Sequence, residues 1–193
     1  HRVDRRQRQM CIRDRDNGKK YMFWGSFRGI YATELTDNGL EIKKKTDGTP
    51  VLKKRICGNR FEGTNIYKRG EYYYLFASIG TCCNGATSTY QTVVGRSKNV
   101  LGPYLDKTGR DMLYDYCEII MSGNETWAGP GHNSILIQDD VGTDWIIYHG
   151  YKKKEAENGR YVLMDKLIWS NDGWPSVKSN APSILEVAPY FQK

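Results

Sequence analysis

The sequence predicts an all-β fold. Seven short segments are rich in β-branched and aromatic residues and are bounded by Gly, Asn or Asp, as is typical of strands. No part of the chain shows sustained helical periodicity. Turn signals with Asn-Gly or Asp-Gly separate several of the segments. The expected strands are residues 21–24, 30–35, 72–78, 89–95, 134–137, 145–149 and 161–169, and the expected turns are residues 37–39, 47–48 and 171–173.

A diffuse repeat groups these strands into three units. Segments 20–26, 72–78 and 144–150 are similar, and each is followed by another expected strand. Alignment on Trp24, Phe76 and Tyr148 gives offsets of 52 and 72 residues. Such offsets suit four-stranded propeller blades with loops of variable length. A closed propeller needs more than three blades, so we predict an incomplete β-propeller, with a β-sandwich as the alternative.

The first fifteen residues differ from the rest of the chain. They show neither strand alternation nor a helical apolar face, and the run from Met10 to Asp14 matches one reading frame of a common transposase sequencing adapter. We predict that residues 1–15 are adapter read-through, or alternatively a disordered basic arm. The underlying codons distinguish the two. On this prediction, residues 16–193 form the partial propeller domain.

The net charge of +7 does not predict a nucleic-acid partner. Residues 1–15 carry six Arg and two Asp, a net of +4, so the remaining residues carry only +3. The clusters Lys43 to Lys45 and Lys152 to Lys154 each lie beside an expected turn, where solvated charges are common. We therefore expect no nucleic-acid binding. The 14 Tyr and 5 Trp suit either sugar rings or an ordinary sheet core.

The five cysteines do not predict a zinc site or a disulfide framework, because their spacing is irregular and no CxxC occurs. We expect the adjacent pair Cys82 and Cys83 not to bond to each other, because that closes a strained ring. No stretch is long and apolar enough to span a membrane.

Glu62 is the carboxylate whose context suggests chemistry. It follows Phe61 and lies at the mouth of a strand, and an apolar neighbour can raise a carboxyl pKa by desolvation. Glycoside hydrolysis needs one such protonated acid and a second carboxylate across the sugar. On its context alone, Glu62 could equally be a solvated surface residue.

An ordered series of motifs extends this interpretation. The motifs are Phe61-Glu62-Gly63-Thr64-Asn65, Tyr72 to Ser78, Cys82-Cys83-Asn84-Gly85, Ser88-Thr89-Tyr90, Val94-Gly95-Arg96-Ser97, Gly102-Pro103-Tyr104, Gly129-Pro130-Gly131-His132, Asp144 to His149 and Asp172-Gly173-Trp174-Pro175. In this order the series resembles family 43 glycoside hydrolases, and within them the endo-arabinanases. The resemblance runs from about Asn17 to Pro175.

The resemblance implies a five-bladed β-propeller, of which this chain holds roughly the last three blades, and inverting hydrolysis of α-1,5-linked L-arabinofuranose chains. Glu62 matches the general acid. Ser26 and Phe27 match a loop lining the sugar cleft, and Ser88 and Tyr90 lie near that cleft.

The resemblance also places His132 facing a central metal, usually calcium. Calcium normally prefers oxygen ligands. Without the resemblance, His132 would be a hydrogen-bonding or solvated residue of a Gly-Pro turn. His149 is interpreted more simply as a strand residue.

Two aspartates of the family pattern are missing. The Asp that tunes the acid sits in an Ile-Asp-Pro motif, which would fall near Gln9 and does not occur here, and the base lies further upstream. Asp14 and Asp16 precede the wrong turn and do not replace them. An inverting site without its base cannot activate water, so we expect the 193-residue chain by itself to be inactive.

The alternatives are an exo-acting arabinofuranosidase or xylosidase of the same family, or a non-catalytic carbohydrate-binding propeller. The expected partner is arabinan or an arabino-oligosaccharide, and the expected state is a monomer. Because polymeric arabinan cannot enter a cell intact, we expect a secreted or periplasmic protein.

Overall fold

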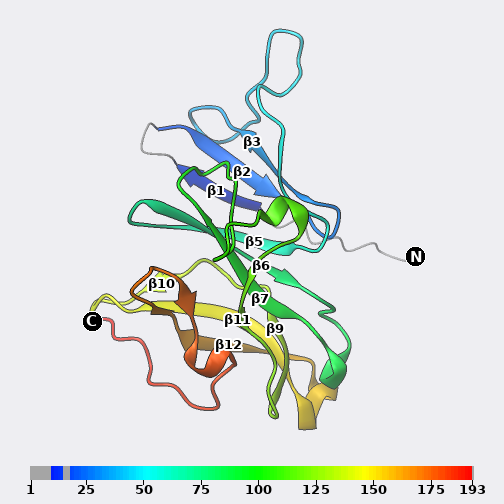
Figure 1. Cartoon of the computed structure of the whole chain (residues 1–193), viewed down its shortest axis with the longest axis vertical. Helices are drawn as coiled ribbons and strands as arrows, with labels where there is room; N and C mark the ends of the chain where they lie inside the picture. The colour runs from blue at the N-terminus through cyan, green and yellow to red at the C-terminus, as the bar shows by residue number, and fades with distance from the viewer. Residues whose placement is uncertain (1–9, 15–17, 193) are drawn as a thin grey trace. The chain divides into compact units, whose positions relative to one another are not determined.

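The computed structural model describes residues 10–14 and 18–192. The chain divides into two compact units, His1–Leu75 with Gly95–Cys117, and Phe76–Val94 with Glu118–Lys193. The strands are short and antiparallel, and the described residues contain no α-helix (Figure 1). The expected all-β fold class is therefore confirmed.

The first sheet has the order β1-β2-β3-β4. Strand β2 pairs with β1 on one side and β3 on the other, with Trp24 opposite Tyr31. Tyr21 and Phe23 of β2 are buried and alternate with half-buried neighbours, the period expected of a strand with one core face. The bounds are Met10–Asp14 for β1, Lys20–Trp24 for β2, Ile30–Glu34 for β3 and Lys54–Cys57 for β4.

The second sheet has the order β5-β6-β7-β8, and its residues are divided between the two units. Strand β6 is buried over nearly its whole length, which explains why its sequence is a continuous apolar and aromatic run rather than an alternating one. The bounds are Glu62–Arg69 for β5, Tyr72–Ile79 for β6, Gln91–Ser97 for β7 and Glu118–Met121 for β8.

The third sheet is built around β11. Strands β9 and β10 pair with one edge of β11 and β12 pairs with the other, and a bulge lies between His149 and Tyr151 where β9 pairs. The bounds are Trp127–Gly131 for β9, Ile137–Gln138 for β10, Asp144–Lys152 for β11 and Arg160–Lys166 for β12. A separate hairpin joins β13, Ile168–Trp169, to β14, Pro175–Ser176.

The repeat found in the sequence matches these sheets. Trp24, Phe76 and Tyr148 lie on β2, β6 and β11, and each of these strands is paired on both edges. The expected turns are present at Gly39, Gly48 and Gly173, each with a positive φ. The sequence did not predict β1, β4, β5, β8, β9 or β14, and of residues 134–137 only Ile137 belongs to a strand.

Short 3-10 helices occupy some of the connections. They are η1 Gly85–Thr87, η2 Met112–Tyr114, η3 Lys153–Asn158 and η4 Lys178–Asn180. Among the residues described, no helix has the length and apolar character that crossing a membrane requires.

Strand β1 falls within the segment predicted to be adapter read-through. Its backbone pairs with β2 from Met10↔Trp24 to Asp14↔Lys20. Residues 1–9 and 15–17, including Gln9, lie outside the described residues. Strand pairing does not report the origin of a sequence, so the adapter hypothesis for residues 1–15 stays a prediction, as does the boundary at residue 16.

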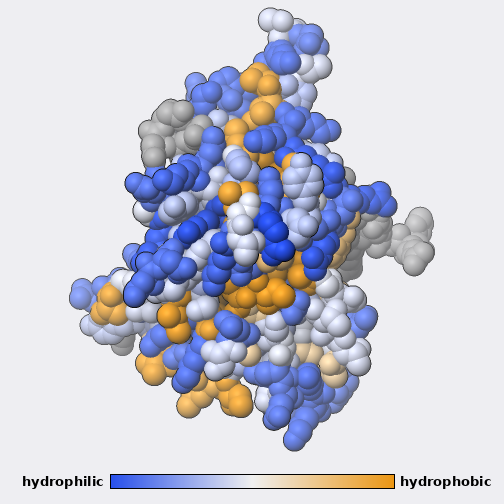
Figure 2. Space-filling model, viewed as in Figure 1, coloured by the Kyte–Doolittle hydropathy of each residue, from blue (hydrophilic) through white to orange (hydrophobic). Residues whose placement is uncertain are grey.

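Large aromatic side chains dominate the core, and hydrophilic side chains cover most of the face shown in Figure 2, interrupted by apolar patches. The fully buried side chains include Phe23, Phe61, Phe76, Tyr90 and Trp145. The 14 Tyr and 5 Trp therefore serve the sheet core at least in part, as the sequence allowed.

Glu34 on β3 makes the first sheet sensitive to acid. Its side chain is 8% exposed and lies 2.9 Å from Lys43 Nζ and 3.6 Å from Lys19 Nζ. The Lys43 hydrogen bond chiefly lowers the pKa of Glu34 below its ordinary value. The unfolded chain therefore binds more protons than the folded chain as the pH falls, and stability is lost.

We expect Glu34→Gln to flatten the pH dependence of stability. Wild-type free energy of unfolding, measured in urea, should fall between about pH 5 and pH 3, and it should fall less in the variant. Glu71→Gln is the matched control, because Glu71 pairs with Lys98 but its side chain is 78% exposed. Equal slopes for the wild type and Glu34→Gln would contradict the prediction.

Candidate active site

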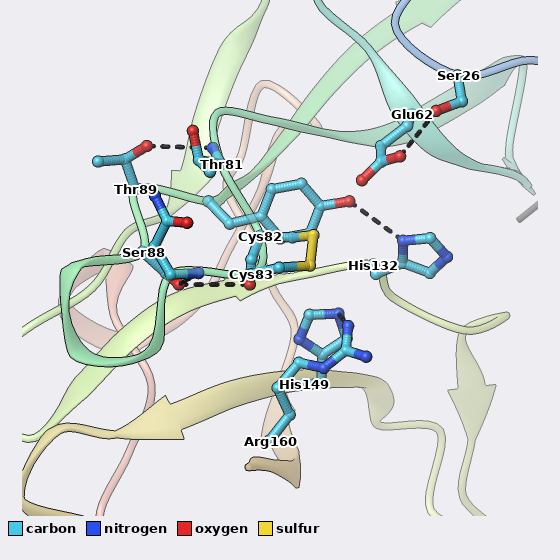
Figure 3. The surroundings of a disulfide bond; sticks show 12 residues. Ser26, Glu62, Thr81, Cys82, Cys83, Ser88, Thr89, His132, His149 and Arg160 are labelled. Atoms are coloured by element: carbon cyan, nitrogen blue, oxygen red, sulfur yellow. Dashed lines mark hydrogen bonds between the residues drawn. A yellow bond between two sulfur atoms is a disulfide. The ribbon is translucent and has the colours of Figure 1, made fainter. Parts of the chain in front are cut away.

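The loop after β2 brings Ser26 to Glu62 (Figure 3). Gly25 has a φ of 139°, and a Cβ there would lie 2.1 Å from the carbonyl oxygen of Gly29, so only glycine fits. The loop is also held by the N–H of Phe27, which donates to the carbonyl oxygen of Phe61 over 2.9 Å. Ser26 Oγ then donates to Glu62 Oε2 over 2.9 Å.

This geometry suits a carboxyl group that changes protonation state. Glu62 is the first residue of β5 and is half-buried, between fully buried Phe61 and buried Gly63. A serine hydroxyl donates to a carboxylate and accepts from a carboxylic acid, so Ser26 can hold Glu62 in either state. The structure thus brings together three predicted residues of the first unit, Ser26, Phe27 and Glu62. Phe27 is 42% exposed and available for contact.

In the second unit, Tyr90 and Ser78 hold His132. Tyr90 Oη lies 3.1 Å from His132 Nδ1, and the backbone N–H of His132 donates to Ser78 Oγ over 2.8 Å. His132 has a φ of 57°, in the left-handed region. A Cβ on Gly131 would lie 2.3 Å from the Tyr90 ring, so the Gly-rich run before His132 is needed for this close packing.

Tyr90 and Ser88, expected near the sugar cleft, are both buried. Tyr90 is 0% exposed and Ser88 is 8% exposed. The contacts that the structure shows for them are internal, Tyr90 to His132 and Ser88 to its own loop. Their proximity to substrate stays a prediction.

His149 is more than a plain strand residue. It lies on β11 as expected, but its ring stacks on Tyr90 and His132, with ring centroids 5.8 and 5.9 Å apart. Burial, followed by the charges of Arg160 and His132, lowers the pKa of His149 to about 4. Arg160 Nη1 lies 3.3 Å from its Nε2. The ring is therefore neutral at neutral pH, which suits its place in an aromatic stack beside a guanidinium group.

Sequence reasoning missed Ser78, although the repeat contains the signal for it. Aligning Trp24 with Phe76 also aligns Ser26 with Ser78. Each serine lies two residues beyond its anchor and hydrogen-bonds a candidate residue at the first strand of the following sheet, Glu62 in one case and His132 in the other.

The expectation for the adjacent cysteines was wrong. Cys82 and Cys83 are joined by a disulfide in the loop between β6 and β7. Local ring strain was the argument against the bond, but hydrogen bonds within the loop, including the one from Ser88 Oγ to the carbonyl oxygen of Cys82, support the loop that carries it. Cys57 is a free, buried cysteine, and burial raises the pKa of its thiol.

A calcium site is not apparent from the side chains. Within the described part of the chain, no group of three or more His, Cys, Asp or Glu residues could hold a metal ion. His132 offers one imidazole, whereas calcium prefers an oxygen-rich set of ligands. His132 could therefore supply only one ligand of a calcium ion, and the expected ion stays a prediction.

The chain's relationship to known proteins agrees with this geometry. The family described as "Glycosyl hydrolases family 43" matches residues 10–175. The chain belongs to glycosyl hydrolase family 43. The match contains Glu62, His132 and all three repeat anchors, and it identifies the protein as a member of a family of glycosidases.

Two relatives and one solved structure illustrate the similarity. The chain is 37% identical over 172 residues to an extracellular exo-α-(1→5)-L-arabinofuranosidase of Cellvibrio japonicus, covering 84% of this chain and 49% of that protein. It is 36% identical over 165 residues to the extracellular endo-α-(1→5)-L-arabinanase 1 of Bacillus subtilis, covering 84% and 48%. The structure of a Cellvibrio cellulosa α-L-arabinanase complexed with arabinohexaose matches with a TM-score of 0.72 and 33% identity, covering 88% of this chain and 56% of that one.

The chain thus spans about half the length of the relatives it matches. Its sheets have the fold of part of the five-bladed β-propeller of the family 43 arabinanases, and the β-sandwich alternative is excluded. The roles assigned to Glu62, Ser26, Phe27, Ser88, Tyr90 and His132 stay predictions, to which the structure adds geometry.

We expect Tyr90→Phe to loosen the His132 ring. Losing one hydrogen bond should lower the free energy of unfolding in urea by about 1 kcal/mol and change the tautomer balance of His132, read by NMR of its ring nitrogens. Tyr114→Phe is the control, because Tyr114 is 72% exposed. An unchanged His132 spectrum in Tyr90→Phe would show that the hydrogen bond does not fix the ring.

Proposed function

We propose that the protein containing this chain hydrolyses α-1,5-linked L-arabinofuranose chains with inversion, and that Glu62 is its general acid. The observation that carries the proposal is the Ser26–Glu62 hydrogen bond on a half-buried carboxyl group within a family 43 fold. The named activities of the two relatives supply the substrate class.

In this reaction Glu62 gives its proton to the glycosidic oxygen as the bond to the anomeric carbon breaks. Water attacks the opposite face of the sugar ring and loses its proton to a base, which inverts the anomeric centre. Ser26 keeps the carboxyl group oriented before and after the transfer, because a hydroxyl can either donate or accept. Phe27, exposed beside Ser26, supplies an apolar face for an arabinose ring.

Endo cleavage of arabinan is the main proposal, and exo action is the second candidate. The exo reading is favoured by the 37% identity to an arabinofuranosidase named as exo-acting. Product analysis separates them, because endo cleavage of linear arabinan gives mixed oligosaccharides early, whereas exo action releases one short product from the chain end. The extracellular relatives support a secreted protein.

A chimaera tests the role of Glu62. Residues 16–193 would replace the matching half of the Bacillus subtilis arabinanase, which supplies the upstream part of the propeller. The chimaera should hydrolyse linear arabinan, and Glu62→Gln should lower kcat by roughly 10²- to 10⁴-fold, the range for a lost general acid. The 193-residue chain alone should show no turnover.

Glu118→Gln is a matched control, since Glu118 begins β8 as Glu62 begins β5. Equal loss of activity in both variants would indicate damage to the fold rather than removal of an acid. Turnover by the chain alone that Glu62→Gln abolishes would refute the expectation of inactivity.

We also propose that His132 contributes one ligand to a calcium ion otherwise held by water. The support is that Tyr90 hydrogen-bonds the ring of His132 and Ser78 hydrogen-bonds its backbone N–H. With a single neutral protein ligand the dissociation constant should be no lower than about 10⁻³ M, the weak end of the range for oxygen-rich extracellular sites. Millimolar calcium should raise the thermal midpoint of the chain, EDTA should reverse the rise, and His132→Ala should show none. A calcium response retained in His132→Ala would contradict the proposal.

A further inference from the structure

The loop between β6 and β7 is closed by its own hydrogen bonds. Ser88 Oγ accepts from the N–H of Asn84 over 3.0 Å and lies 3.3 Å from the carbonyl oxygen of Cys82. At the neck of the loop, the N–H of Thr89 donates to the carbonyl oxygen of Thr81, and the N–H of Thr81 donates to Thr89 Oγ1, both over 3.1 Å. These hydrogen bonds support the conformation of the loop in addition to the disulfide.

Ser88, whose hydroxyl makes two of these bonds, and the following Tyr90 are buried, whereas Thr89 is exposed. Of the two cysteines, Cys82 is half-buried and Cys83 is exposed. A Cβ added to Gly85 would lie 3.6 Å from Ala156 Cβ, so η1 rests on η3, which supports the loop from behind. The Cys82–Cys83 disulfide is thus an apolar group at the surface, on a loop that packs against η3.

Stabilisation of the fold does not explain this bond. A disulfide stabilises a protein mainly by closing a loop of the unfolded chain, and the effect grows with the number of residues enclosed. A bond between neighbours encloses none. It does replace two thiols, which are weak donors, with a polarisable group that has no donor. Forming the disulfide therefore changes the chemical character of the surface that the loop presents.

That surface lies next to the candidate residues of the second unit. In Figure 3 the surroundings of the disulfide include His132 and His149, and Tyr90 Oη lies 3.1 Å from His132 Nδ1. A ring sugar has an apolar C–H face as well as hydroxyl groups, and rigid apolar surfaces bind such faces with little loss of conformational entropy.

We propose that the Cys82–Cys83 disulfide is a sugar-contacting platform, against which the C–H face of one arabinofuranose unit packs. This inference rests on the proposed function, since it assigns a contact for the same substrate. Ser88 acts as a positioning residue, because it fixes Cys82 through the loop backbone rather than touching the sugar.

The test is the affinity of the chain for arabinohexaose, measured by isothermal titration calorimetry. Cys82→Ala/Cys83→Ala should bind about fivefold more weakly, the ratio expected for one lost small apolar contact. Its thermal midpoint should stay close to that of the wild type. Thr87→Ala is the matched control, because Thr87 is an exposed residue of the same loop whose hydroxyl donates to Asn84 O, and its affinity should not change.

If Cys82→Ala/Cys83→Ala does not fold, the wild-type chain can be compared before and after reduction of its disulfide. Affinity should fall on reduction and return on reoxidation. If Cys82→Ala/Cys83→Ala or the reduced chain binds arabinohexaose as tightly as the wild type, the disulfide is not a sugar-contacting platform. That result would leave the proposed function unchanged. Absence of arabinohexaose binding by the unmodified, folded chain counts against the proposed function and overturns the platform with it.

Discussion

Glu62 and His132 each depend on a hydrogen bond to a serine that lies two residues beyond the anchor residue of a repeat. Ser26 follows Trp24 and holds the side chain of Glu62, and Ser78 follows Phe76 and holds the backbone of His132. Each serine closes a hydrogen bond to the first strand of the following sheet, or to the residue just beyond it. A hydroxyl is suited to this place because it can accept from an N–H in one repeat and donate to a carboxyl group in another.

Glycine makes the close approach at these serines possible. Gly25 lets the chain turn so that Ser26 reaches Glu62, and Gly131 leaves room for the Tyr90 ring beside His132. Neither position accepts a Cβ without moving backbone or an aromatic ring. The Gly-rich motifs around the candidate residues are therefore explained by packing, independently of any direct role in chemistry.

The two units treat their candidate residues differently. Glu62 is half-buried next to an exposed phenylalanine, a setting where a substrate could reach a proton donor. His132 is also half-buried, but it belongs to a stack of three rings with buried Tyr90 and half-buried His149. The first arrangement suits proton transfer, and the second suits holding one group in a fixed orientation.

The sequence by itself determined the all-β class, the three repeats and their anchors, because long aromatic and β-branched runs such as that of β6 form strands wherever they can be buried. It also pointed to Glu62, through an ordered set of motifs. Only the tertiary structure decided the rest. Strand β9 contains Gly129 and Pro130 and lacks strand composition, so it becomes a strand only by pairing with β11. From the sequence we expected no bond between Cys82 and Cys83, because the ring that it closes is strained. Local strain does not take account of the hydrogen bonds that support the loop, which are seen only in the tertiary structure. The serine contacts and the His149 stack join residues far apart in the chain, and their distances depend on how the sheets pack.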